Sequence, residues 1–260
     1  MESLVLQKGP AALGRVAPLF ATWPENMIAS ALQGQMGSVW QLGENGPALC
    51  QNGDFWFSTS ANPDMLEAIL QKLNGRFGIL AFAPGTETEN VQQALEPAAK
   101  PCIRYAMQKG GGRFDVAHLQ ALISALPAEM RLRPIDAVLY RQCLEQEWSR
   151  DFVAQFASAQ DFEARGLGVA AMIGDQIISG ASSYVCFQGG IEIEVDTRRD
   201  YRRRGVASAC CASLILNCLS RGLYPSWDAA NLASAGLAEK LGYRLAGPYV
   251  VWHLNDTHEE

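Results

Sequence analysis

The spacing of hydrophobic and polar positions predicts mixed α/β structure in the N-terminal half of the chain. Residues 36–60 alternate between apolar and polar side chains around glycine-containing turns, which is typical of strands joined by hairpins. A helix is predicted over residues 62–73, since an asparagine suited to the N-cap precedes a proline in the first turn. An apolar strand over residues 77–83 should follow, and further helices are expected over 91–99 and 117–125.

The pattern of the C-terminal half is more regular and predicts the element order α-α-β-β-β-α-β-α-β. The predicted elements are one or two helices over 138–164, strands over 168–173, 176–184 and 190–197, a helix over 206–221, a strand over 223–228, a helix over 232–241 and a strand over 249–254. Residues 131–136 resemble a linker or a joining strand. We therefore predict two domains, residues 1–133 and residues 134–260.

Composition narrows the class of protein. Hydrophobic residues make up 48% of the chain and charged residues 18%, which is enough apolar surface for a folded core. No apolar run reaches the roughly 18 residues that a membrane span needs. The first residues lack the basic segment of a secretory signal. We expect a cytoplasmic protein that does not bind a membrane.

The charges are unevenly distributed along the chain. The formal net charge is −6, which disfavours general binding to nucleic acid. Residues 198–204 nevertheless hold five arginines and one aspartate. A concentrated positive segment in an acidic chain indicates one anionic ligand, and we expect no nucleic-acid partner.

The cysteines indicate neither a disulfide framework nor a metal site. There are seven, an odd number, and no C-x-x-C pair occurs among them: Cys50, Cys102, Cys143, Cys186, Cys210, Cys211 and Cys218. We interpret them as reduced thiols and predict no bound metal.

The segment with the clearest chemistry is the strand over 190–197, the basic turn after it, and the helix that opens at Gly205. A helix N-terminus presents unpaired N–H groups and partial positive charge, and glycine allows the backbone to approach a ligand closely. This combination predicts a phosphate or pyrophosphate site. The alternative is a solvated basic turn that opens an ordinary helix.

This segment resembles the signature of the GNAT superfamily of acyl-CoA N-acyltransferases. Residues 202–207, Arg-Arg-Arg-Gly-Val-Ala, match the pattern Q/R-x-x-G-x-G/A. Asn231, Ser234 and residues 237–243 resemble the superfamily ending N-x-x-S-x-x-L-x-x-K-x-G-F/Y. The resemblance covers roughly residues 136–255. The Glu-Val-Asp-Thr and Trp-Asp-Ala-Ala-Asn segments look most like the zwittermicin A resistance-like GNAT group.

The resemblance implies a GNAT-type mixed sheet flanked by helices in the C-terminal half. The N-terminal α/β domain is then either a degenerate GNAT-like half or a separate lid. The implied activity is transfer of an acetyl group from acetyl-CoA to a primary amine of a small molecule, by direct attack in a ternary complex. No metal is implied.

The resemblance also implies positions for the acyl donor. The CoA pyrophosphate would be held by Arg202, Arg203, Arg204, Gly205, Val206, Ala207 and Ser208. A bulge in the preceding strand would expose backbone to pantetheine and to the thioester carbonyl at Val195, Asp196 and Thr197. Asn231 and Ser234 match the residues that lie near pantetheine in the superfamily.

A base is needed because a primary alkylamine is almost fully protonated at neutral pH. Glu192 and Glu194 are the candidates, and their spacing places both on one face of a strand unless a bulge intervenes. We favour Glu192, since Glu194 lies nearer the expected bulge. The alternative is that both carboxylates belong to a solvent-facing side of the sheet.

One position departs from the superfamily pattern. Many GNAT enzymes carry a tyrosine after the leucine of the last helix, as the acid for the leaving thiolate, whereas Ala238 follows Leu237 here. Water, Ser234, Tyr249 or a residue of the N-terminal half could replace that acid. The departure also keeps open a CoA-binding regulatory or sensing module without catalysis. Asp228 is a candidate contact for the acceptor amine, with an ion pair or a turn cap as its alternative role.

Overall fold

The computed structural model describes residues 3–110 and 112–256. It divides into two compact units: unit 1 comprises the chain up to Arg104 together with the segment from Pro248 onward, and unit 2 comprises Tyr105–Gly247. The predicted division after residue 133 falls inside unit 2. The division into units 1 and 2 lies within two strands, β6 and β13, and no linker marks it.

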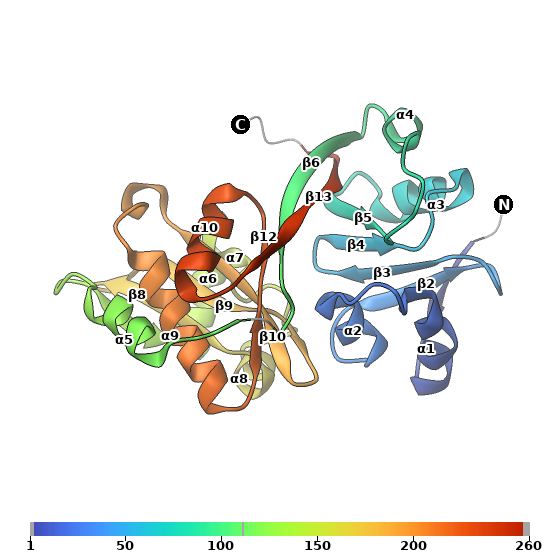
Figure 1. Ribbon diagram of the computed structural model, residues 1–260. Helices are drawn as coiled ribbons and strands as arrows, with labels where there is room; N and C mark the ends of the chain where they lie inside the picture. Colours follow the sequence, from blue (N-terminus) through green and yellow to red (C-terminus); the bar gives the residue numbers. More distant parts are fainter. Residues whose placement is uncertain (1–2, 111, 257–260) are drawn as a thin grey trace. The chain divides into compact units, whose positions relative to one another are not determined.

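Unit 1 is a mixed sheet with helices (Figure 1). Its strands are β1 (Leu4–Gln7), β2 (Ser38–Leu42), β3 (Ala48–Asn52), β4 (Phe55–Ser58), β5 (Gly78–Phe82) and parts of β13 (Leu245–Leu254) and β6 (Ala99–Met107). Its helices are α1 (Pro10–Val16), η1 (Ala17–Phe20), α2 (Asn26–Leu32), α3 (Pro63–Leu73) and α4 (Val91–Leu95). β4 and β5 pair in parallel, and the pairs β1–β2, β2–β3, β3–β4 and β5–β13 are antiparallel. Trp40, Trp56 and Ile69 belong to one buried cluster beneath α3.

The helix predicted over 62–73 is confirmed as α3. The Met65 backbone N–H donates to Asn62 Oδ1 at 2.8 Å, so the asparagine caps the helix as expected. The helix predicted over 91–99 is too long, because α4 ends at Leu95. Pro97 disfavours the helical conformation at Glu96, which is extended, and β6 begins at Ala99.

Unit 2 contains a five-stranded sheet in the order β11-β10-β9-β8-β7. Its strands are β7 (Arg131–Pro134), β8 (Gly168–Ile173), β9 (Gln176–Phe187), β10 (Gly190–Thr197) and β11 (Tyr224–Ser226), and β12 (Asp228–Ala229) pairs with β6. Its helical segments are α5 (Val116–Ser124), α6 (Ala137–Glu145), α7 (Glu147–Arg150), α8 (Ala159–Arg165), η2 (Arg199–Tyr201), α9 (Val206–Ser220) and α10 (Leu232–Leu241). Together the two units confirm a mixed α/β architecture.

The predicted elements of the C-terminal half are largely confirmed. Of the two alternatives for residues 131–136, a linker or a joining strand, the strand is confirmed, since residues 131–134 form β7 at the edge of the sheet, antiparallel to β8. The one or two helices predicted over 138–164 are three, and β9 and β13 are longer than predicted. The single strand predicted over 223–228 is two short strands, β11 and β12, which pair with different partners. Because β12 pairs with β6 and not with β10, the second half of β10 has no partner strand on this side.

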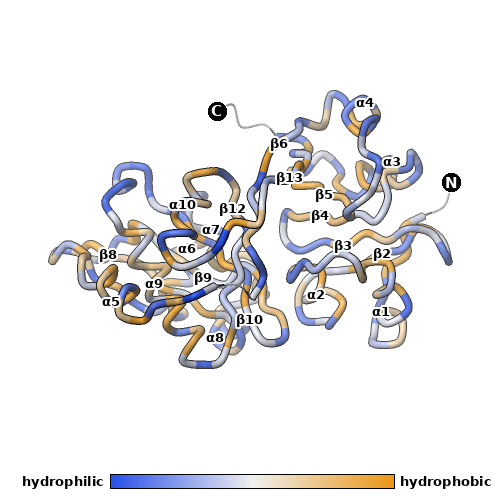
Figure 2. The backbone as a smooth tube through the Cα atoms, in the orientation of Figure 1, coloured by the Kyte–Doolittle hydropathy of each residue, from blue (hydrophilic) through white to orange (hydrophobic). Residues whose placement is uncertain are grey.

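α9 is the central helix of unit 2. Most of its residues are apolar or small, as the hydropathy colouring of the backbone in Figure 2 lets the reader follow, and it packs against β8, β9 and β10 as well as against α5. Leu214, Ile215 and Cys211 are fully buried. Burial of this apolar helix on the sheet fixes its N-terminus beside the end of β10.

Candidate functional site

The sheet of unit 2 opens along β10. β10 and β11 pair in parallel only from Gly190 opposite Tyr224 to Glu192 opposite Ser226. On its other side β10 continues to pair with β9 as far as Thr197. Beyond Ser226 the chain enters β12, which pairs with β6 instead. The second half of β10 therefore has an edge that β11 does not cover.

A pocket of about 460 Å³ lies between the end of β10 and the N-termini of α9 and α10. Eleven of the twelve predicted cofactor residues line it: Val195, Asp196, Thr197, Arg202, Arg203, Gly205, Val206, Ala207, Ser208, Asn231 and Ser234. The structure adds Leu237, the leucine of the motif that ends the resemblance, and Tyr201 and Ala233, which no sequence motif singled out. We call this cavity the α9 pocket.

The exception among the predicted residues is Arg204. Its guanidinium lies over the ring of Tyr201, 5.1 Å from the ring centroid, and Arg198 lies over the same ring at 4.7 Å. Arg198 also donates to both carboxylate oxygens of Asp200 at 2.8 Å. These hydrogen bonds hold the pKa of the Asp200 carboxyl below its usual range. Arg204 thus lies beside the α9 pocket, packed on an aromatic ring.

Arg202 holds the basic turn against the end of β10. Its Nε donates to the Thr197 carbonyl at 2.9 Å, and its Nη2 donates to Asp196 Oδ1 at 3.2 Å. Asp196 Oδ1 also accepts from the Thr197 backbone N–H. The turn is therefore ordered by its own hydrogen bonds. Five arginines against two aspartates in this segment leave it positively charged.

The turn enters α9 through two residues in left-handed backbone conformation. Arg203 has φ +61° and Gly205, the N-cap of α9, has φ +80°. The first intrahelical hydrogen bond runs from the Ala209 N–H to the Gly205 carbonyl at 3.1 Å. The N–H groups that precede it belong to the unpaired set of a helix N-terminus, and residues 206–208 line the pocket. This geometry suits an anion such as a phosphate.

Asn231 and Ser234 have structural contacts at the start of α10. The Ser234 N–H donates to Asn231 Oδ1 at 2.9 Å, so Asn231 is the N-cap of the helix. Ser234 Oγ accepts from Trp227 Nε1 at 3.2 Å. Both residues line the α9 pocket, and their hydrogen bonds hold the start of α10, which forms part of the pocket wall. Their proposed contact with pantetheine stays a prediction.

Replacement of the Asn231 side chain should therefore destabilise the protein. We expect Asn231→Ala to lower the free energy of unfolding by about 1 kcal/mol, because a helix N-terminus loses its cap. Asn231→Asp retains an acceptor oxygen and should stay near the wild type. Urea unfolding followed by circular dichroism measures both variants, and equal stability of Asn231→Ala and the wild type would contradict the capping role.

The bulge expected at Val195–Thr197 is not found there. Those residues pair regularly with Ala181, Gly180 and Ser179 of β9. The side chain of Ser179 fixes this register, since its Oγ donates to the Asp196 carbonyl at 2.9 Å and lies 2.7 Å from Thr197 Oγ1. The second half of β10 is therefore a regular strand with one uncovered edge.

The register shift of β10 lies instead next to Glu192. Glu192 is opposite Val185, whereas the next residue, Ile193, is opposite Ser183, so Tyr184 of β9 is the extra residue of the bulge. Glu192 is 3% exposed, and Glu194 is half-buried. The alternative, that both carboxylates belong to a solvent-facing side of the sheet, does not hold for Glu192.

The structure places a lysine near Glu192 that sequence reasoning missed. Lys109 Nζ lies 3.8 Å from Glu192 Oε2 and donates to Ser226 Oγ at 3.0 Å. Lys109 belongs to no motif and is far from Glu192 in the sequence. The pairing of β6 with β12, which local sequence does not reveal, brings the two close together.

The remaining predicted positions have distinct surroundings. Ala238 is fully buried in α10, and the preceding Leu237 lines the α9 pocket. Asp228 is in β12 opposite Ala106 of β6. Tyr249 belongs to the part of β13 in unit 1. Of the candidates for the missing acid, Ser234 lies in the α9 pocket lining.

The cysteines are free thiols, and all but Cys102 are buried. Burial raises the pKa of Cys143, Cys210 and Cys218 to about 12, so these thiols are protonated at neutral pH. Across residues 3–110 and 112–256, no group of three or more histidine, cysteine or acidic side chains is arranged to hold a metal ion. No helix in that part of the chain is long and apolar enough to span a membrane.

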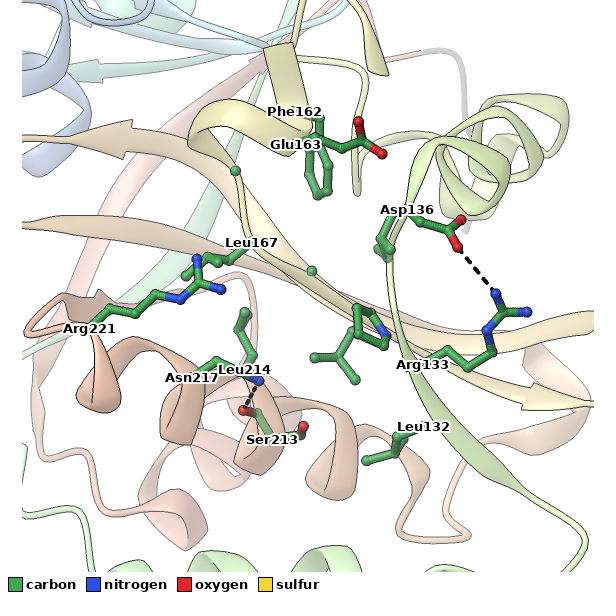
Figure 3. A pocket seen from close by; sticks show the side chains of 15 residues that line it. Leu132, Arg133, Asp136, Phe162, Glu163, Leu167, Ser213, Leu214, Asn217 and Arg221 are labelled. Carbon is green, nitrogen blue, oxygen red and sulfur yellow. Dashed lines mark hydrogen bonds and ion pairs between the residues drawn. The ribbon is translucent and has the colours of Figure 1, made fainter. Parts of the chain in front are cut away.

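A second pocket of unit 2, of about 340 Å³, is lined by β7, α8, the start of β8 and α9 (Figure 3). The acidic groups of this pocket accept hydrogen bonds from the start of α6. Asp136 Oδ1 accepts from the N–H groups of Val138 and Leu139, and Glu163 Oε1 accepts from the Ala137 N–H. Asp136 also pairs with Arg133 at 3.2 Å. The predicted site residues do not line this pocket, and its acidic groups hold the start of a helix.

Comparison with known proteins identifies the family. A model of the GNAT acetyltransferase family matches residues 17–252, and the chain belongs to this family. The protein is thus an acyltransferase of the GNAT type. Because the match begins at residue 17, the N-terminal half is included in the family architecture.

Several known proteins resemble the chain. A GCN5-related N-acetyltransferase-like protein from Streptococcus suis 89/1591 is 40% identical, with a TM-score of 0.86 over 95% of this chain and 100% of that chain. The uncharacterized N-acetyltransferase YdfB of Bacillus subtilis (strain 168) is 31% identical over 111 residues, which are 42% of this chain and 40% of that protein. The match thus spans less than half of the length of this Bacillus relative.

The fold also resembles that of a tandem GNAT protein from the clavulanic acid biosynthesis pathway. Its TM-score is 0.53 at 12% identity, over 100% of this chain and 99% of that one. This likeness concerns the fold alone and supports an arrangement of two GNAT domains.

Proposed function

We propose that this enzyme transfers an acetyl group from acetyl-CoA to a primary amine of a small molecule, by direct attack in a ternary complex. The observation that carries the proposal is the α9 pocket, which gathers the predicted donor residues beside the strand that bears Glu192. Family membership supports acetyl transfer. The amine acceptor and the order of the reaction are our inference from the site.

The α9 pocket suits an acyl donor with a pyrophosphate. The N–H groups at the start of α9 would bind the phosphate oxygens, and Arg202 and Arg203 add positive charge at the same wall. The uncovered edge of β10 at residues 195–197 would pair with the pantetheine amides. A backbone N–H on this edge would donate to the thioester carbonyl oxygen and stabilise the negative charge that develops on it.

Glu192 would act as the general base. Its carboxylate takes a proton from the acceptor ammonium, directly or through water, and the neutral nitrogen attacks the thioester carbonyl carbon. The new C–N bond forms, the C–S bond breaks, and the electron pair leaves with the CoA thiolate. The attacking nitrogen must then lose its surplus proton, and the Ser234 hydroxyl in the pocket wall or water is proposed to relay that proton to the thiolate, which gives the neutral amide and the CoA thiol.

A covalent acetyl-cysteine intermediate has little support in unit 2. Cys210 and Cys211 lie in α9 and are fully buried, and burial raises the pKa of both thiols. The thiolate is the nucleophilic form of cysteine, and it is disfavoured here. This supports direct attack by the amine.

Three finer assignments remain proposals that rest on the sequence. Asp228 is proposed to contact the acceptor ammonium. The zwittermicin A resistance-like GNAT group is the proposed subgroup, which suggests an aminated small molecule as acceptor. A cytoplasmic location is proposed because acetyl-CoA is the donor.

The proposal is tested with a panel of primary amines, including aminated antibiotics and amino-acid-derived polyamines. The purified enzyme is incubated with acetyl-CoA and each amine, thiol release is followed, and products are identified by mass spectrometry. We expect an N-acetylated product formed in equal amount to the released CoA, and intersecting initial-rate plots when both substrates are varied. Parallel plots together with an isolable acetyl-enzyme would contradict the ternary mechanism.

A further inference from the structure

We infer that Lys109 is a positioning residue for Glu192, whose ammonium keeps this buried carboxyl ionised and ready to accept a proton. The inference rests on the proposed role of Glu192 as the general base. It assigns a function to a residue outside every motif of the sequence. It also gives the segment between β6 and α5 a part in the chemistry of unit 2.

The geometry places Lys109 between a hydroxyl and the carboxylate. Its Nζ donates to Ser226 Oγ at 3.0 Å and lies 3.8 Å from Glu192 Oε2. The Glu192 side chain is 4% exposed, and that of Lys109 is 26% exposed. Ser226 is directly opposite Glu192 in the β10–β11 pair, at the last position before the sheet opens. The Lys109 ammonium therefore lies at the point where β11 stops pairing with β10.

Contacts of the backbone just before Lys109 hold it in this place. Ala106 of β6 pairs with Asp228 of β12, and β12 directly follows β11 in the chain. The end of β6 therefore lies close to β11. The Gln108 N–H donates to the Arg244 carbonyl at 2.8 Å, and the Tyr224 hydroxyl donates to the Gln108 carbonyl at 3.4 Å. The position of the lysine is therefore fixed by its backbone and does not depend on its side chain alone.

The physical need for such a cation follows from burial. Removal of a carboxylate from water disfavours its charged form, whereas a positive charge within about 4–6 Å favours it. A general base must be unprotonated to act. A buried glutamate without a nearby cation would remain protonated well into the neutral pH range and would be a poor base at physiological pH.

The other titratable groups around this part of β10 do not supply that charge. Burial raises the pKa of Tyr224 and Tyr243, and the negative charge of Glu192 raises both further. Lys109 acts in the opposite direction on the pKa of Tyr224. Both tyrosines are thus neutral at neutral pH.

Two thiols of the neighbouring elements carry no charge. The Cys186 thiol of β9 and the Cys211 thiol of α9 are neutral, since burial raises the pKa of each. Glu194 lies on β10 itself, and its negative charge would disfavour the ionised form of Glu192. α7 carries one residue of each sign, Glu147 and the exposed Arg150. Lys109 is the cation that the structure pairs with Glu192.

The test compares the pH dependence of turnover in Lys109→Met, Lys109→Arg and the wild type. The rate falls at low pH as Glu192 becomes protonated, so removal of the ammonium should move this acid limb to higher pH. We expect a shift of about one pH unit or more in Lys109→Met and a limb near that of the wild type in Lys109→Arg. Lys100→Met removes an equal charge at an exposed position of β6 in unit 1 and should leave the limb in place. An unshifted limb in Lys109→Met would overturn the inference.

A second measurement separates this inference from the proposed function. The carboxyl carbon of Glu192 is followed by NMR with ¹³C-labelled glutamate, and its signal is assigned by its loss in Glu192→Gln. The titration midpoint should rise by about one pH unit or more from the wild type to Lys109→Met, whether or not an acceptor amine is known. An unchanged midpoint would overturn the role of Lys109. A raised midpoint together with full activity of Glu192→Gln would instead overturn only the role of Glu192 as the base. Lys109→Gln, which keeps a donor for Ser226, replaces Lys109→Met if that variant fails to fold.

Discussion

Glu192→Gln is expected to lower kcat for amine acetylation by about 100-fold or more while the KM for acetyl-CoA stays near its wild-type value. The substitution keeps the size of the side chain and removes its ability to take a proton. General-base catalysis typically contributes about 10²–10⁴-fold, and its loss falls on the chemical step. The donor residues of the α9 pocket do not include Glu192, so acetyl-CoA should bind as before.

Glu194→Gln is the matched comparison, because it makes the same chemical change two residues away on the same strand. Glu194 is half-buried, whereas Glu192 is buried and paired with Lys109. Steady-state kinetics with the best amine of the panel should show the larger loss of kcat at Glu192. A larger loss at Glu194, or unchanged turnover in Glu192→Gln, would assign the base elsewhere.

Gly205→Glu is expected to weaken acetyl-CoA binding by about 100-fold or more. Gly205 has φ +80°, and a residue with a side chain pays roughly 1–2 kcal/mol in this region. The new carboxylate would also lie at the helix N-terminus, where it would compete with and repel the donor pyrophosphate. The strained backbone and the added negative charge should both weaken the binding of acetyl-CoA.

Gly222→Glu is the control, since it makes the same substitution just beyond the other end of α9. Gly222 has φ +68°, and, as at Gly205, no atom lies within 4 Å of the position that a Cβ would take. Both variants should therefore lose similar stability by thermal unfolding. Equilibrium dialysis with labelled acetyl-CoA should show loss of binding only in Gly205→Glu, and equal binding by the two variants would exclude the start of α9 as the donor site.

The residues of the donor site could be predicted from the sequence because they are nearly contiguous. The end of β10, the basic turn and the start of α9 lie within residues 195–208, and local signals define a strand, a turn and a helix there. Asn231 and Ser234 entered the prediction through a second local motif. α9 is long and apolar, so its burial on the sheet follows directly from its composition.

The features that the sequence did not reveal depend on contacts between distant segments. Nothing local shows that β11 and β12 pair with different strands, and this difference opens the sheet beside β10. The regular pairing of Asp196 and Thr197 is accompanied by hydrogen bonds to the hydroxyl of Ser179 on β9. Lys109 reaches Glu192 through the pairing of β6 with β12 and the contacts of Gln108 with Arg244 and Tyr224.

The N-terminal half illustrates the same limit. Its capped helix α3 was predictable from Asn62 and Pro63, whereas β6 was assigned to no element. β6 and β13 each run from one compact unit into the other, so no linker composition marks the division. The family match from residue 17 to residue 252 shows that this half belongs with the rest.

The central claim is that the α9 pocket binds the acyl donor, and isothermal titration calorimetry of the purified protein with acetyl-CoA, CoA and ATP tests it most directly. The account predicts micromolar binding of acetyl-CoA and of CoA, with one molecule bound per chain, and much weaker binding of ATP, which lacks pantetheine. The absence of acetyl-CoA binding by the folded protein would contradict the account, because the basic turn would then be a solvated surface feature.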